Sequence, residues 1–79
     1  MRPPKDRNGN VVRVGDRVRL VCLLPGNWLE ELPHEEKRDV MSMIGEVFVV
    51  EEIDELGSPW IRKLSHSIAL ASDEMELVP

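Results

Sequence analysis

Histidine and cysteine are the side chains that most often bind metals or act as nucleophiles, and this chain holds two histidines and one cysteine. His34 opens a His-Glu-Glu-Lys run, which lacks the second histidine of a His-Glu-x-x-His zinc helix. His66 stands alone, and no Cys or His spacing matches a zinc site. A nucleophilic cysteine needs a nearby base and an electropositive pocket, and the sequence places neither beside Cys22. We therefore expect no bound metal and no catalytic centre.

Acidic side chains are the second kind that could bind or catalyse, and two groups of them lie in the C-terminal part of the chain. A calcium site would need about six converging oxygens and a loop with a glycine at its sharp turn, and that spacing is absent. No glycine-rich phosphate loop is present either, so we expect no cofactor. A solvated acidic surface is one interpretation, and a docking surface for a basic partner is the other, since the formal net charge is −5. These acidic residues are Glu51, Glu52, Asp54 and Glu55, followed by Asp73, Glu74 and Glu76.

Two tryptophans are the candidate aromatic contacts of such a docking surface. Trp60 opens an expected strand, where a half-exposed ring could anchor a partner; packing in the small core is the alternative. Trp28 lies in an expected helical segment, where it either covers Val21 and Leu23 or contacts a partner. The candidate partner-binding residues are Trp60, Glu51, Asp54, Glu55 and Trp28.

Length and hydropathy indicate the class of protein. A chain of 79 residues holds one domain, and the apolar runs along it argue against disorder. The longest uncharged apolar run, from Leu20 to Pro25, is far too short to span a membrane. The N-terminus leads into no apolar stretch typical of a secretory signal, and a single cysteine excludes an internal disulfide. We therefore expect a cytoplasmic protein without a membrane partner.

The distribution of charge also bears on nucleic-acid binding. Nucleic-acid-binding proteins usually carry a basic stripe whose contacts release counterions. This chain is acidic overall, so we do not expect nucleic acid to be a partner, although a local basic patch near the N-terminus would favour one. The early basic residues are Arg2, Lys5, Arg7, Arg13, Arg17 and Arg19.

The longest run with strand character extends from Gly45 to Asp54. Its alternation places Val47, Val49, Glu51 and Ile53 on one face, and Phe48, Val50 and Glu52 on the other. Both faces are apolar in the first half, so we expect that half to be covered on both sides. A long strand of this kind is typical of one that bends around a small barrel.

An earlier strand is expected at residues 17–23, with Val18, Leu20 and Cys22 facing the core. A helical segment should connect this strand to the long one. A helix should begin after Pro33 and run to about Ile44. Its apolar stripe of Val40, Met43 and Ile44 should lie against the barrel and cover the outer side of the earlier strand. The Asn-Gly pair at residues 8–9 predicts a tight turn.

The remaining elements are expected to be short. A turn at residues 54–57 should lead to a strand at 60–64, and Ser65-His66 should turn the chain into a strand at 67–70. A single helical turn at 71–74, capped by Ser72, should precede a last strand at 75–78. We expect residues 1–10 to form a flexible arm and turn, and residues 11–79 to form one domain.

Three short motifs resemble those of SH3-like barrels. Residues 14–20, Val-Gly-Asp-Arg-Val-Arg-Leu, resemble the Gly-Asp-x-Val opening of many such barrels, including KOW-type modules and the small-subunit domain of nitrile hydratase. Residues 44–47 resemble the start of their second strand, and residues 71–74 resemble their closing turn. The resemblance covers about residues 14–78. It implies a mainly β fold: a small five-stranded SH3-like barrel with a helical insert at about residues 28–44, between the first and second main strands.

The resemblance also bears on function. Trp60 resembles the ligand-contacting tryptophan of eukaryotic-type SH3 domains, but the chain has no Tyr and one Phe, so the aromatic pair that lines a groove for proline-rich peptides is missing. We therefore expect a non-catalytic interaction module or accessory subunit that binds a protein partner. The alternatives are a KOW-like nucleic-acid or ribosome-associated factor, and a small enzyme or enzyme subunit. The partner and the oligomeric state are left open.

Overall fold

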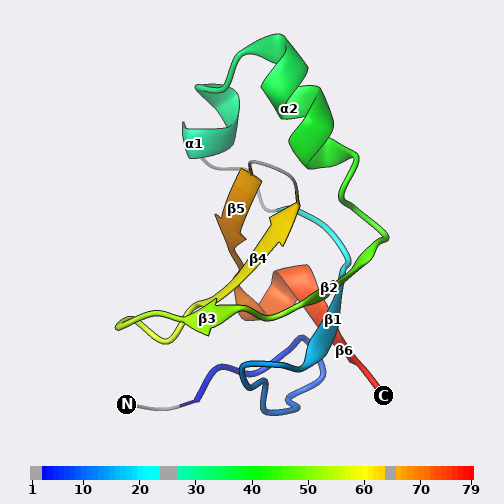
Figure 1. Ribbon diagram of the computed structural model, residues 1–79, viewed down its shortest axis with the longest axis vertical. Helices are drawn as coiled ribbons and strands as arrows, with labels where there is room; N and C mark the ends of the chain where they lie inside the picture. The colour runs from blue at the N-terminus through cyan, green and yellow to red at the C-terminus, as the bar shows by residue number, and fades with distance from the viewer. Residues whose placement is uncertain (1–2, 24–26, 64–65) are drawn as a thin grey trace.

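The computed structural model describes residues 3–23, 27–63 and 66–79 (Figure 1). The fold is mainly β, as predicted, with two helices between the first and second strands. In chain order the elements are β1 (Arg17–Leu20), α1 (Asn27–Glu30), α2 (His34–Met41), β2 (Val47–Val49), β3 (Glu52–Ile53), β4 (Pro59–Lys63), β5 (His66–Ala69), the 3₁₀ turn η1 (Ser72–Glu74) and β6 (Met75–Val78).

The strands form two antiparallel three-stranded sheets, with orders β2-β1-β6 and β3-β4-β5. The stretch expected as one long strand is divided into β2 and β3, because the residues before Val50 pair with β1 and the residues after it pair with β4. Val50 exchanges main-chain hydrogen bonds with the turn before β1, donating to Asp16 and accepting from Gly15. One residue later, Glu51 donates to the carbonyl of Trp60 at 2.9 Å. The chain therefore crosses from one sheet to the other at this point.

The hydrophobic core lies between the two sheets and receives side chains from both. The alternation predicted for β1 is confirmed, since Val18 and Leu20 are fully buried and the intervening arginine is exposed. From the other sheet, Ile61 and Ile68 face each other across β4 and β5 and are also buried. Among the described residues, the core cluster also contains Val12, Leu29, Val40, Met43, Phe48, Val50, Leu70 and Met75.

One expectation about β2 is wrong. Phe48 and Val50 are buried, but Val47 and Val49 are 42% and 51% exposed, so the first half of the predicted long strand is covered on one face only. The helices do not cover the other face of β2: they lie at one end of the sheets, at the top of Figure 1.

The helical insert closes that end of the core. Leu29 of α1, Val40 of α2 and Met43 after it are buried, and Leu32 packs against them from the connection between the helices. The predicted stripe is therefore correct for Val40 and Met43. It is wrong for Ile44, which is 36% exposed, because α2 ends at Met41 and a turn then leads to Gly45. Within the part of the chain described, no helix is long and apolar enough to cross a membrane.

The segment before β1 lies along β6. The predicted Asn-Gly turn is confirmed, with Gly9 at φ 84° donating to the carbonyl of Asp6. Asp6 is only 3% exposed, and the neighbouring Arg7 donates its backbone N–H to Met75 at 3.1 Å. Residues 6 and 7 thus cover the edge of β6 that β1 leaves open.

The C-terminal half follows the predicted order of turn, strand, strand, single turn and strand. The turn at residues 54–57 is confirmed, with Gly57 at φ 81°. His66 belongs to β5 rather than to the turn before it, while Leu64 and Ser65 lie outside the described residues. The cap of η1 differs from the prediction: Ala71 precedes the turn, and the carboxylate of Glu74 accepts the N–H of Ala71 at 2.7 Å.

Candidate functional site

Trp60 lies on the outer face of the sheet β3-β4-β5. The next residue, Ile61, is fully buried, and the strict alternation of β4 therefore directs Trp60 away from the core. Its cross-strand neighbours are Glu52 on β3 and Ala69 on β5. The ring is half-buried, so it is available to a ligand while remaining supported by the sheet.

Asp54 holds the indole ring in place. The indole N–H of Trp60 donates to Oδ2 of Asp54 at 2.8 Å. The other carboxylate oxygen accepts the backbone N–H groups of Leu56 and Ser58, each at 2.9 Å. The hydrogen bonds from Ser58 and from the Trp60 indole lower the pKa of Asp54 below its usual value. The ring is therefore tied to a turn whose carboxylate stays charged near neutral pH.

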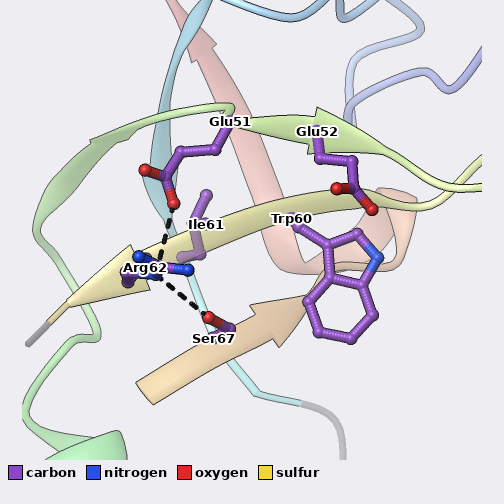
Figure 2. Close-up of a pocket in the computed structure, with 6 residues that line it drawn as sticks. All are labelled: Glu51, Glu52, Trp60, Ile61, Arg62 and Ser67. Atoms are coloured by element: carbon purple, nitrogen blue, oxygen red, sulfur yellow. Dashed lines mark hydrogen bonds and ion pairs between the residues drawn. The ribbon is translucent and has the colours of Figure 1, made fainter. Parts of the chain in front are cut away.

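A hollow of about 300 Å³ lies beside this ring, and Figure 2 shows the side chains around it. Arg62 forms an ion pair with Glu51 at 3.7 Å, and its Nε donates to Oγ of Ser67 at 3.3 Å. A second hollow, of about 330 Å³, lies on the β5 side, and Trp60 and Ser67 border both hollows. The first is lined by Glu51, Glu52, Trp60, Ile61, Arg62 and Ser67, and the second by Trp60, Ser67, Ile68 and Ala69.

Glu52 is the acidic side chain of this face without a partner among the described residues. It is exposed, and Figure 2 shows its carboxylate beside the Trp60 ring. Glu51, in contrast, is paired with Arg62. A carboxylate beside an aromatic face is suited to a cation, because the ring's quadrupole and the negative charge both attract it. The geometry can therefore bind a lysine or arginine side chain.

The structure brings together three of the five predicted site residues. Trp60 and Glu51 line the first hollow, and Asp54 bonds to Trp60. Glu55 is exposed on the turn after Asp54 and does not line either hollow. The side chain of Trp28 lies outside the described part of the structure.

Arg62 and Ser67 are members of the site that the sequence analysis missed. A signal for Arg62 was present, because it lies two positions after Trp60 on the same strand face. The position of Ser67 depends on the register between β4 and β5, which places it opposite Arg62. No local pattern in the sequence specifies that register.

The second acidic group lies elsewhere and does not form a comparable surface. Glu74 is only 7% exposed and caps η1, so its assignment to a solvated acidic surface is wrong. Glu76 lies on β6 and forms an ion pair with Arg19 at 3.7 Å. Asp73 is exposed, and its carbonyl accepts a long contact from Cys22 at 3.5 Å.

The histidines and the cysteine are dispersed. His66 approaches Asp39 at 3.8 Å, and His34 lies 3.4 Å from Arg38 on the same helix. Cys22, expected in the core, is half-buried because β1 ends before it and the alternation of the strand stops. Across residues 3–23, 27–63 and 66–79, no cluster of three or more acidic, histidine or cysteine side chains could hold a metal ion.

Two of the early arginines have partners within the protein. Arg17 donates to the backbone carbonyl of Pro79 at 2.8 Å, and Arg19 pairs with Glu76. Both lie on the outer face of β1, while Arg13 is exposed in the loop before it.

No protein-family model, no curated protein and no solved structure matches the chain. The site is therefore interpreted from its own geometry.

Proposed function

We propose that this protein is a non-catalytic interaction module that binds a basic segment of a protein partner through the outer face of β3-β4-β5. The observation that carries the proposal is the half-buried Trp60, oriented by Asp54 and flanked by the carboxylate of Glu52, which has no partner among the described residues. An aromatic ring that is fixed before binding loses little conformational freedom when a ligand contacts it. Tryptophan is also the residue type most enriched among the strongest contacts of interfaces.

The charge of the whole chain supports a basic partner. A formal net charge of −5 attracts cationic segments over a distance of about 8 Å at physiological salt. The same charge repels nucleic acid, and two of the early arginines, Arg17 and Arg19, are occupied by Pro79 and Glu76. A KOW-like nucleic-acid function therefore has less support than protein binding. The cytoplasmic location stays a prediction.

We also propose that the two sheets are the halves of an SH3-like barrel. The supporting feature is the run from β2 to β3, which pairs with β1 on one side of Val50 and with β4 on the other. A strand that bends around a small barrel is what the residue pattern from Gly45 to Asp54 predicted. The single 3₁₀ turn η1 before β6 is the second supporting feature.

Peptide titration followed by NMR tests the proposed binding. The probe is a capped peptide of alternating lysine and valine, and the readout is the resonance of the Trp60 indole N–H, assigned with a Trp60→Phe variant. We expect this resonance to shift with the lysine peptide and not with an equivalent glutamate peptide. An unchanged indole resonance at millimolar lysine peptide would refute the proposal.

A matched pair of variants distinguishes the effect of the Glu52 charge on binding from the effect of the protein's net charge. Glu52→Gln and Glu35→Gln remove the same charge, but Glu35 lies on α2, away from the site. A solvent-exposed ion pair contributes about 0.2–1 kcal/mol, so Glu52→Gln should weaken binding by up to about fivefold. Glu35→Gln should have little effect. Equal effects would mean that only the net charge matters.

A further inference from the structure

The outer edge of β5 presents main-chain groups that β4 does not use. Leu70 donates its N–H to Pro59 at 2.9 Å, and these two residues are opposite each other in the β4–β5 register. Hydrogen-bonded and non-hydrogen-bonded pairs alternate along an antiparallel ladder. Ile68 is therefore bonded to Ile61 in the ladder, and the N–H and C=O groups of Ser67 and Ala69 point away from β4.

No other strand of the described chain pairs with this edge. β5 is the last strand in the order β3-β4-β5. In Figure 1 its free side, at the left of the view, faces no neighbouring strand. An edge of this kind is a template for pairing with an added strand, which is a common mode of peptide recognition.

The side chains next to this edge leave room for a ligand. Ser67 and Ala69 are small, and between them and the ring of Trp60 lies the hollow of about 330 Å³. A side chain of an added strand that lies next to Ala69 can therefore pass over the methyl group and contact the ring. Trp60 would then bind a side chain of the same segment whose backbone pairs with β5.

We propose that the partner's basic segment binds in an extended conformation, as an additional strand on β5, with a lysine or arginine side chain over Trp60. This inference rests on the proposed function and specifies the form of the ligand. Main-chain hydrogen bonds to Ser67 and Ala69 supply affinity that is independent of the ligand's sequence. The Trp60 face selects the positive side chain.

Charge complementarity favours a positively charged ligand. The basic side chains near β5 already have acidic partners: Arg62 pairs with Glu51, Lys63 contacts Glu46 at 2.7 Å, and His66 approaches Asp39. Glu52, across the ring from β5, has no such partner among the described residues. Two copies of this chain would bring two negative net charges together, so a second copy is less suited to this edge than a basic segment.

Amide hydrogen exchange measured by NMR tests the added strand directly. In the free protein, the N–H groups of Ser67 and Ala69 should exchange rapidly, whereas the N–H of Ile68 is protected by the ladder. Saturation with the capped lysine–valine peptide, about six residues long like a typical strand, should slow exchange at Ser67 and Ala69 by about tenfold or more. Ile68 is the internal control, and its exchange should change less.

The outcomes distinguish this inference from the proposed function. If the Trp60 indole resonance shifts but Ser67 and Ala69 remain unprotected, the peptide binds across the face, and strand addition is refuted while the proposed function stands. If neither signal changes, both are refuted. If both amides become protected at high protein concentration without peptide, the occupant is a second copy and the proposed basic ligand is wrong.

A proline variant provides an independent measurement. Ala69→Pro removes an N–H that the β4–β5 ladder does not use, and proline is tolerated on edge strands in this orientation. We expect the variant to retain the far-ultraviolet circular dichroism of the parent and to bind the peptide at least tenfold more weakly. Unchanged affinity in a folded Ala69→Pro protein would overturn the inference. In Ser72→Pro, the proline occupies the first position of η1, so this variant controls for proline substitution outside the edge.

Discussion

The carboxylate of Asp6 accepts the backbone N–H of Leu77 at 2.7 Å, across a sequence separation of 71 residues. The same carboxylate accepts the N–H groups of Asn8 and Asn10 at 2.9 and 2.8 Å. One buried side chain therefore shapes the first turn of the chain and joins that turn to the last strand. Removal of the Asp6 carboxylate should therefore destabilise both the turn and its attachment to β6.

Asp6→Ala should destabilise the protein by about 1–3 kcal/mol, because it leaves three partly buried backbone N–H groups without this acceptor. The midpoint of urea denaturation measures the change. Asp73→Ala is the matched control, since Asp73 is exposed and its carboxylate makes no contact among the described residues. Equal midpoints for Asp6→Ala and the parent would show that the turn and β6 do not depend on this carboxylate.

The pH dependence of stability should reflect the same group. Burial opposes ionisation of Asp6, but its hydrogen bonds, that from the Leu77 N–H foremost, outweigh burial, and the pKa of Asp6 is lowered. A carboxyl with a lowered pKa in the folded state stabilises the protein above its unfolded pKa of about 3.9, and this stability is lost as the pH falls through the folded pKa. Asp54, whose pKa is also lowered, contributes with the same sign.

We therefore expect stability to be nearly constant between about pH 5 and 7 and to decline below about pH 4. Urea denaturation at a series of pH values measures the decline. Asp6→Asn should be less stable at pH 7 and should show a shallower decline in acid, because its side chain no longer titrates. A decline as steep as that of the parent would assign the acid sensitivity to other carboxyls.

The helical insert allows a direct comparison of neighbouring residues. Met43 is fully buried, so Met43→Ala should cost about 2–5 kcal/mol. Ile44 is 36% exposed, so Ile44→Ala should cost less, about 1 kcal/mol. Lys37→Ala removes a surface ion pair with Glu30 and should change stability by less than about 1 kcal/mol. A larger loss for Ile44→Ala than for Met43→Ala would contradict the packing described here.

Asp54 should affect binding through Trp60. Asp54→Ala removes the acceptor of the indole N–H, and the ring then has more freedom to lose on binding. We expect the Trp60 indole resonance to move in the free protein and the lysine–valine peptide to bind several-fold more weakly. Glu55 lies on the same turn and makes no hydrogen bond to Trp60, so Glu55→Ala serves as the control. A normal affinity for Asp54→Ala would show that ring orientation is unimportant.

Local patterns predicted most of the strands and turns. Alternation in β1 identified Val18 and Leu20 as buried, and the glycine of the turn before β4 marked the position of that turn. The bend at Val50 was not predictable as a break, because no glycine, proline or other turn residue interrupts the sequence between Gly45 and Asp54. Its cause is non-local: Val50 bonds to residues 15 and 16, whereas Glu51 bonds to Trp60.

The candidate site was predictable only in part for the same reason. Trp60 could be identified from its residue type and strand position, and Asp54 and Glu51 from their place in an acidic run. Their roles differ, since Asp54 positions the ring while Glu51 neutralises Arg62, and that difference depends on contacts between strands. The burial of Asp6 likewise depends on Leu77, which is distant in sequence.

The place of β6 in the fold has a consequence for synthesis of the protein. β6 pairs along the edge of β1 that β2 does not use, and Leu20 is opposite Met75, so this edge lacks its partner until β6 has been made. Contacts of such long sequence separation make folding slow. During translation, the sheet β2-β1-β6 cannot be completed before Met75–Val78 leave the ribosome, and until then this edge of β1 is exposed to chaperones or to other chains.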